Sequence, residues 1–174
     1  PLYYKLPYSD LWSWSSCGTR IACSVNGTDI KIFDQQRGPL RRWQPTLADE
    51  DDYITALKFS PDGSYLVSAC DDGFIRLWDN VTGNYEQLQV WNTKREIHQS
   101  YYQPRLSVSA CSKYITVSRG NRAFLKDVES GGKTIKSLMS TFNAGKESII
   151  TKTVFSSDNS SVFLCCREML QVWR

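Results

Sequence analysis

The chain has 174 residues, of which 41% are hydrophobic and 22% are charged, and its formal net charge is +3. This length and composition allow a hydrophobic core and exclude a largely disordered protein. The net charge is too small to indicate a nucleic-acid partner by itself, and no apolar run approaches the roughly 18 residues of a membrane span. Six cysteines without a Cys-x-x-Cys pair favour reduced, partly buried thiols in an intracellular protein over a disulfide framework.

The first predicted elements are three short strands joined by turns. Residues 11–14 and 19–25 form two apolar runs on either side of the turn 15–18. Asn26-Gly27 then predicts a tight hairpin, because both residues tolerate the positive φ that two-residue hairpins require. The third run, residues 30–34, ends in Phe-Asp.

Residues 53–83 carry the clearest pattern in the chain. Three alternating apolar runs are separated by Ser60-Pro-Asp-Gly63 and Asp71-Asp-Gly73, and the last run reads Ile-Arg-Leu-Trp-Asp at 75–79. Alternation with a period of two, broken by Asp-Gly turns, is typical of an antiparallel β-meander. We therefore expect three strands in this stretch.

The same order of runs and turns returns twice more. One copy has runs at 105–108, 114–118 and 123–127, and the next has runs at 152–155, 162–166 and 170–174. The four closing positions are about 45–48 residues apart; they are Asp34, Asp79, Asp127 and Arg174. Such a period indicates a repeat protein in which each copy is one structural unit.

The unit resembles one blade of a WD40-repeat β-propeller. The resemblance implies an all-β fold of about four four-stranded antiparallel blades, in a single WD40-like propeller region over residues 1–174. The expected blade units are about 8–48, 53–92, 104–142 and 148–174, with the last one incomplete. We expect part of a larger, seven- or eight-bladed ring; alternatively, residues 2–6 supply the missing outer strand and close a small ring.

In the WD40 family, a hydrogen-bonded group of Trp, Ser, Asp and His locks each blade. The resemblance places three members of this group in the second unit, at Trp78, Ser68 and Asp72. His98, the only histidine, is expected to be a structural partner in the third unit, and Trp173 holds the Trp position of the fourth. The other units depart from the pattern, with Phe33 and Lys126 at the Trp position, so their internal locking is expected to be weaker.

Propeller topology also predicts an interaction rim. Turns between the second and third strands, and the links between blades, emerge on one side of such a ring. Arginine and tyrosine on these loops have the composition of protein interaction sites. The predicted rim residues are Arg119, Arg122, Tyr101, Tyr102, Asp71 and Arg167, with the acidic run 49–52 nearby.

Catalytic chemistry finds no support in the sequence. The lone histidine has no Cys or carboxylate at metal-ligand spacing, and no nucleophile motif or pair of isolated acids is present. We therefore expect a non-catalytic scaffold, cytoplasmic or nuclear, that holds proteins together in a larger assembly, with no cofactor, metal, membrane or small-molecule substrate. The alternative is a module that binds RNA or ribonucleoprotein through the rim arginines.

Overall fold

The computed structural model describes residues 11–35, 38–43, 53–81, 86–93, 103–140, 148–167 and 169–174, with the backbone alone for 38–43. Fifteen strands in four antiparallel sheets make up the regular structure of these residues. Within the same ranges there is no helix with the length and apolar character needed to cross a membrane.

Each sheet is a simple meander, so strands that follow one another in the chain are neighbours. The first sheet contains β1 (Trp12–Trp14), β2 (Arg20–Val25), β3 (Asp29–Asp34) and β4 (Gly38–Trp43). The second contains β5 (Ile54–Phe59), β6 (Tyr65–Cys70), β7 (Phe74–Asp79) and β8 (Gln87–Asn92). The third contains β9 (Arg105–Val108), β10 (Tyr114–Arg119), β11 (Arg122–Asp127) and β12 (Lys133–Met139). The fourth contains β13 (Ile150–Phe155), β14 (Val162–Cys166) and β15 (Leu170–Trp173).

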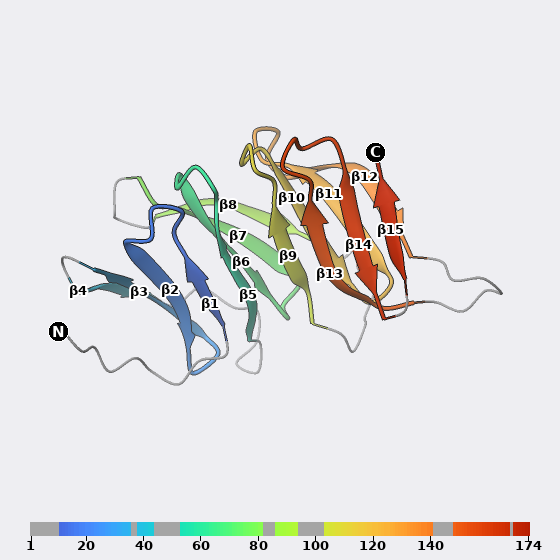
Figure 1. Cartoon of the computed structure of the whole chain (residues 1–174). Coiled ribbons are helices and arrows are strands. Elements are labelled where there is room, and N and C mark those ends of the chain that lie inside the picture. Colours follow the sequence, from blue (N-terminus) through green and yellow to red (C-terminus); the bar gives the residue numbers. More distant parts are fainter. Residues whose placement is uncertain are drawn as a thin grey trace.

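The four sheets follow one another in chain order, as Figure 1 shows, with the first and fourth at opposite ends of the row. The first strand of each sheet lies beside the first strand of the next, so that β1 contacts β5, β5 contacts β9 and β9 contacts β13. We call these four the inner strands. Sheets that pack face to face around a common set of inner strands have the arrangement of propeller blades.

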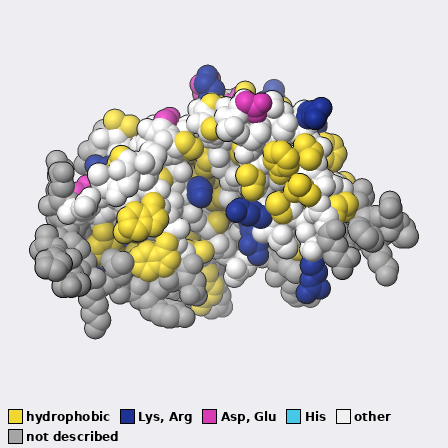
Figure 2. Space-filling view, viewed as in Figure 1, with side chains coloured by type: hydrophobic (Ala, Val, Ile, Leu, Met, Phe, Trp, Pro, Cys, Tyr) yellow, Lys and Arg dark blue, Asp and Glu magenta, His cyan; other side chains and the backbone are white. Residues whose placement is uncertain are grey.

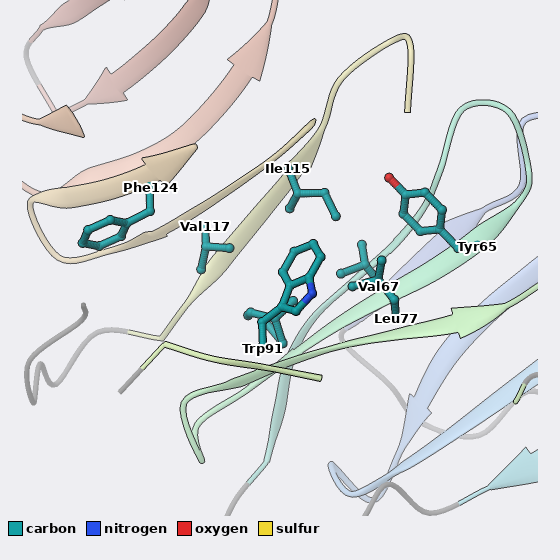
Figure 3. Packing of buried hydrophobic residues seen from close by; sticks show 9 residues of the cluster. Tyr65, Val67, Leu77, Trp91, Ile115, Val117 and Phe124 are labelled. Carbon is teal, nitrogen blue, oxygen red and sulfur yellow. The ribbon is translucent and has the colours of Figure 1, made fainter. Parts of the chain in front are cut away.

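The largest core cluster fills the space between the second and third sheets. Val67, Leu77 and Trp91 of the second sheet pack against Ile115 and Val117 of the third (Figure 3). Burial of side chains of this size contributes roughly 1.5–3 kcal/mol each.

Two polar and steric features hold these sheets in place. The Tyr65 hydroxyl donates a 2.7 Å hydrogen bond to the carbonyl of Ser112, across the junction between the two sheets. Gly132, at φ +80°, lies directly against the Trp91 ring, where a Cβ would collide with the indole. The loop between β11 and β12 therefore requires glycine at this position.

The predicted fold class is confirmed. The meander expected over 53–83 corresponds to β5, β6 and β7, and β8 completes the second sheet. The fourth sheet has three strands among the described residues. Residues 2–6, considered above as a source of its missing strand, lie outside the described residues.

Candidate interaction surface

The second sheet contains the hydrogen bond expected between its Trp and Ser. Trp78 on β7 donates from Nε1 to Oγ of Ser68 on β6 at 3.0 Å, and both side chains are buried. In the strand register Trp78 faces Leu66, so Ser68 is the diagonal neighbour two residues along the strand. A buried indole N–H needs such a partner, and this contact ties the two strands together.

Asp72 has a partner that the sequence reasoning missed. Its carboxylate accepts a 2.5 Å hydrogen bond from Nη2 of Arg76, and it also accepts the backbone N–H of Phe74 at 2.8 Å. Arg76 and Asp72 are 5% and 3% exposed, so this ion pair belongs to the interior of the second sheet. The only signal in the sequence was the spacing of four residues across a tight turn.

Trp173 lies differently from Trp78. It faces Val162 in the register, and the diagonal position that Ser68 holds in the second sheet is occupied by Leu164. The Trp173 Nε1 atom is buried without a hydrogen-bond partner among the described residues, and the Lys136 ammonium lies 5.5 Å from the indole ring centre. The other predicted locking residue, His98, lies outside the described residues.

Two of the predicted rim residues come together although they are far apart in the chain. Asp71, in the turn between β6 and β7, lies 3.8 Å from Nη2 of Arg119 at the end of β10. Arg122 faces Arg119 across the β10–β11 turn. Arg167, exposed after β14, makes no contact with them that the structure records, and Tyr101 and Tyr102 lie outside the described residues.

The turn that follows the first strand has the same hydrogen-bonding pattern in the second and fourth sheets. In the second sheet, Asp62 accepts the Ser60 hydroxyl at 2.7 Å and the Ser64 backbone N–H at 3.0 Å. In the fourth sheet, Asp158 accepts the Ser156 hydroxyl at 2.5 Å and the Ser160 backbone N–H at 3.0 Å.

The first sheet places a thiol, Cys17, at this turn position. The Cys17 Sγ atom lies 3.4 Å from the Ser15 hydroxyl and 2.9 Å from the Thr19 hydroxyl. Hydrogen bonds from these two hydroxyls lower the pKa of the Cys17 thiol to about 7. All six cysteines are free; Cys17 and Cys111 are exposed, while burial raises the pKa of Cys70 to about 12.

A groove along the inner strands was not anticipated from the sequence. It has a volume of about 320 Å³ and crosses all four sheets. The residues that line it are Leu11, Trp12, Thr55, Ala56, Leu57, Arg105, Leu106, Thr151, Lys152 and Thr153. A metal site finds no support in the described part of the chain, which holds no cluster of three or more His, Cys, Asp or Glu side chains.

The geometry agrees with three comparisons. The sequence profile of the WD40 family (WD domain, G-beta repeat) matches residues 43–79. The chain carries a WD40 repeat. This match includes β5, β6 and β7, the three strands whose turns gave the clearest sequence pattern.

Curated relatives match over a short segment. WD repeat-containing protein 1 of Xenopus tropicalis is 41% identical over 59 residues, which are 34% of this chain and 10% of that protein. Nuclear distribution protein PAC1 of Coccidioides posadasii is 42% identical over 65 residues, or 37% of this chain and 13% of that protein. The chain thus spans a small part of the length of the curated relatives that it matches.

Among solved structures, a chain in the crystal structure of a mitotic checkpoint complex superposes with a TM-score of 0.71. The alignment covers 95% of this chain and 47% of that chain, with 18% sequence identity. The likeness extends over all four sheets and shows the WD40-like propeller fold.

Proposed function

We propose that this chain is a non-catalytic scaffold that holds proteins together in a multi-subunit intracellular assembly, as part of a larger propeller ring. WD40-repeat proteins are in general protein-interaction scaffolds. The observation that supports the proposal is the 3.8 Å contact between Asp71 and Arg119, because it brings charged loop residues of two sheets together on one rim. The free cysteines are consistent with a reducing compartment.

The charged side chains of the rim remain accessible to a partner. Asp71 and Arg119 keep 30% and 16% of their side-chain surface exposed, so both can still meet a partner. Arg122, on the same turn as Arg119, adds a second guanidinium beside them. Arginine suits interfaces because its planar group donates several hydrogen bonds with little further loss of conformational freedom.

The proposal is tested with the double variant Arg119→Glu/Arg122→Glu, and with Arg122→Glu alone as a variant that keeps the Asp71–Arg119 pair. Both are compared with wild type in affinity capture from cell extract, with identification of the bound chains by mass spectrometry. Lys133→Glu/Arg174→Glu is the matched control, because both side chains are exposed and lie away from the rim turns. Circular dichroism confirms that every variant is folded.

We expect the rim variant to lose specific protein partners that wild type and control retain. Retention of every partner by the rim variant would contradict the proposal. Loss of RNA, with protein partners unchanged and a steep fall of affinity with salt, would assign the rim to nucleic acid instead.

A further inference from the structure

An exposed patch on the rim joins the second sheet to the third, and each of its members contacts or faces the next. The Asp71 backbone N–H donates a 3.0 Å hydrogen bond to the carbonyl of Tyr53, and the Asp71 side chain lies 3.8 Å from Arg119. Arg119 faces Arg122 across the β10–β11 turn, and Arg122 faces Met139 on β12. We call these five residues the rim patch. The second and third sheets each have a neighbouring sheet on both sides, so the patch does not owe its exposure to the end of the row.

Apolar side chains stand at the two ends of the rim patch, with the charges between them. Tyr53 and Met139 are 47% and 40% exposed. The Tyr53 ring lies against Gly27 in the β2–β3 turn, where a Cβ would collide with it, so the ring is held close to the backbone. Tyrosine, methionine and arginine are enriched in protein interfaces. The composition of the patch is therefore that of a surface which meets another protein.

The turn that carries the two arginines is anchored from both sides. The Ser140 backbone N–H donates to the carbonyl of Asn121 at 2.9 Å, and the Ile150 backbone N–H donates to the carbonyl of Gly120 at 2.7 Å. A turn that is fixed by such bonds loses little further conformational freedom when a partner binds.

The rim patch has a net charge of +1, because it contains two guanidinium groups and one carboxylate. Among the described residues no carboxylate pairs with Arg122, whereas Arg119 contacts Asp71. The adjacent Asp72 is buried in an ion pair with Arg76 and adds no net charge. Figure 2 shows Lys and Arg side chains in the lower middle of the visible face, toward the rim turns, and Asp and Glu mainly along its upper edge. A single carboxylate from a partner would neutralise the patch.

The spacing of the patch fits an extended chain. Arg119, Arg122 and Met139 stand on three successive strands of the third sheet, β10, β11 and β12. Neighbouring strands are about 4.8 Å apart, so Met139 lies roughly 7 Å from the point midway between the two arginines. Side chains on one face of an extended chain recur about every 6.7 Å, at every second residue. An acid can therefore lie between the arginines while the side chain two residues away lies on Met139.

We propose that the rim patch binds an extended protein segment in which a carboxylate has an apolar side chain two residues away on each side. The carboxylate contacts Arg119 and Arg122, and the apolar side chains contact Met139 and Tyr53. This inference rests on the proposed scaffold function and names the chemistry of the partner.

Phosphate groups fit the rim patch less well than a carboxylate. A phosphorylated side chain carries a charge of about −1.5 to −2 at neutral pH, which exceeds the net charge of the patch, and Asp71 repels it. Single-stranded nucleic acid needs several aromatic platforms on which bases stack, and Tyr53 is the one aromatic member of the patch. The carboxylate of Asp71 thus selects a singly charged acid over a phosphate.

The experiment uses the 174-residue chain and a fluorescent peptide, Leu-Thr-Glu-Thr-Leu, measured by fluorescence anisotropy. Comparison peptides carry glutamine or phosphoserine in place of glutamate, and Thr-Leu-Glu-Leu-Thr has the same composition with the leucines next to the acid. An oligouridine is tested in parallel. The protein variants are Arg122→Gln, Met139→Gln and Asp71→Asn. Lys133→Gln is the matched control, because Lys133 is an exposed cation at the far end of the strand that holds Met139.

We expect the glutamate peptide to bind about fivefold more tightly than the glutamine peptide, a preference that Arg122→Gln removes and Lys133→Gln keeps. The peptide with displaced leucines should bind more weakly than the first peptide, and Met139→Gln should reduce this difference. Asp71→Asn should strengthen the phosphoserine peptide about threefold more than the glutamate peptide, because it removes the repelling charge. A merely structural role for Asp71 would not change the order of the two peptides.

Equal binding of the glutamate and glutamine peptides, or a preference that persists in folded Arg122→Gln, would overturn the proposal. Tighter binding of the phosphoserine peptide or of oligouridine to wild type would overturn it as well, as would no binding of any peptide at about 1 mM protein. Partners captured through the rim, together with no glutamate preference, would refute this chemistry and leave the scaffold function standing. A glutamate preference without any rim-dependent partner in cell extract would support the chemistry and contradict the scaffold function.

Discussion

The second and fourth sheets share a tryptophan at one position, yet they use it differently. Trp78 and Trp173 both close the third strand of their sheet and face an apolar residue on the second strand. The second sheet offers Ser68 at the diagonal position, and the indole N–H is bonded at 3.0 Å. The fourth sheet offers Leu164, and the N–H has no partner among the described residues. The tryptophan therefore packs against the core in both sheets, and in the second sheet it also makes a hydrogen bond.

The two sheets also differ at the position that Arg76 holds in the second. Arg76 faces Ser68 in the register, and its counterpart in the fourth sheet, opposite Leu164, is the uncharged Gln171. The second sheet is thus held by a buried ion pair and by an indole hydrogen bond, while the fourth depends more on apolar packing. Specific polar contacts of this kind are expected to make the second sheet the more resistant to local opening.

The largest effect is expected from breaking the buried pair. Asp72→Ala leaves the Arg76 guanidinium in the interior without its carboxylate and should lower the free energy of unfolding by about 3–5 kcal/mol. Urea denaturation followed by tryptophan fluorescence measures it. The double variant Asp72→Asn/Arg76→Gln approaches the neutral arrangement of the fourth sheet and should lose less than Asp72→Ala alone. A greater loss in the double variant would show that the pair itself, not the stranded charge, supplies the stability.

The next largest effect on stability is expected from substitution of the two tryptophans. Trp78→Phe removes the hydrogen bond to Ser68 as well as part of the ring, whereas Trp173→Phe removes ring area and weakens the contact with the Lys136 ammonium but removes no hydrogen bond. We expect Trp78→Phe to cost about 1–2 kcal/mol more than Trp173→Phe, because a lost bond leaves the buried Ser68 hydroxyl unpaired. Equal losses of stability by chemical denaturation would mean that the indole hydrogen bond contributes nothing measurable.

The same sheets show how much of the structure could be predicted from the sequence. Alternating strands and Asp-Gly turns are local signals, so the four sheets and the Trp78–Ser68 neighbourhood could be expected from the chain alone. The Asp72–Arg76 pair and the groove could not be predicted in this way. The partner of Asp72 depends on which side of β7 turns inward, and the groove depends on the relative register of four sheets. Sequence spacing does not encode such alignments between sheets.

The pH dependence of stability in acid tests the turns that contain Asp62 and Asp158. Hydrogen bonds from the Ser156 hydroxyl and from the Ser160 backbone and side chain lower the pKa of Asp158 to about 2. Burial raises the pKa of Asp62, but hydrogen bonds from Ser60 and Ser64 outweigh burial, and the pKa is lowered. A carboxyl whose pKa is lower in the folded state stabilises the fold above its unfolded pKa, and this contribution is lost as the pH falls through the folded pKa.

We therefore expect the free energy of unfolding to fall between about pH 4 and pH 2, where carboxyls with lowered pKa values protonate. Asp62→Asn and Asp158→Asn should each flatten this decline. Asp158 should have the larger effect because its pKa is lowered to about 2, whereas burial opposes the lowering at Asp62. Denaturation at a series of pH values measures the slope, and a slope unchanged in both variants would show that the turn carboxylates do not stabilise the sheets.

The smallest effect is on the reactivity of the Cys17 thiol and not on stability. It tests whether the turn after the first strand stabilises a negative charge in the first sheet, as it does in the second and fourth. Cys17 holds there the place of Asp62, and the Ser15 and Thr19 hydroxyls lower the pKa of its thiol to about 7. In a Cys111→Ser background, which removes the other exposed thiol, alkylation by iodoacetamide should reach half its maximal rate near pH 7.

Thr19→Val removes one of these hydroxyls and should move the midpoint to higher pH, which slows alkylation at pH 7 by up to about tenfold. Cys70, buried and with a pKa raised to about 12, provides an internal reference that should stay unlabelled in the folded protein. A midpoint for Cys17 near that of an ordinary free thiol, and the same in Thr19→Val, would show that the first-sheet turn does not stabilise a negative charge. The likeness among the three turns would then be one of backbone shape, with the acceptor role confined to the sheets that carry aspartate.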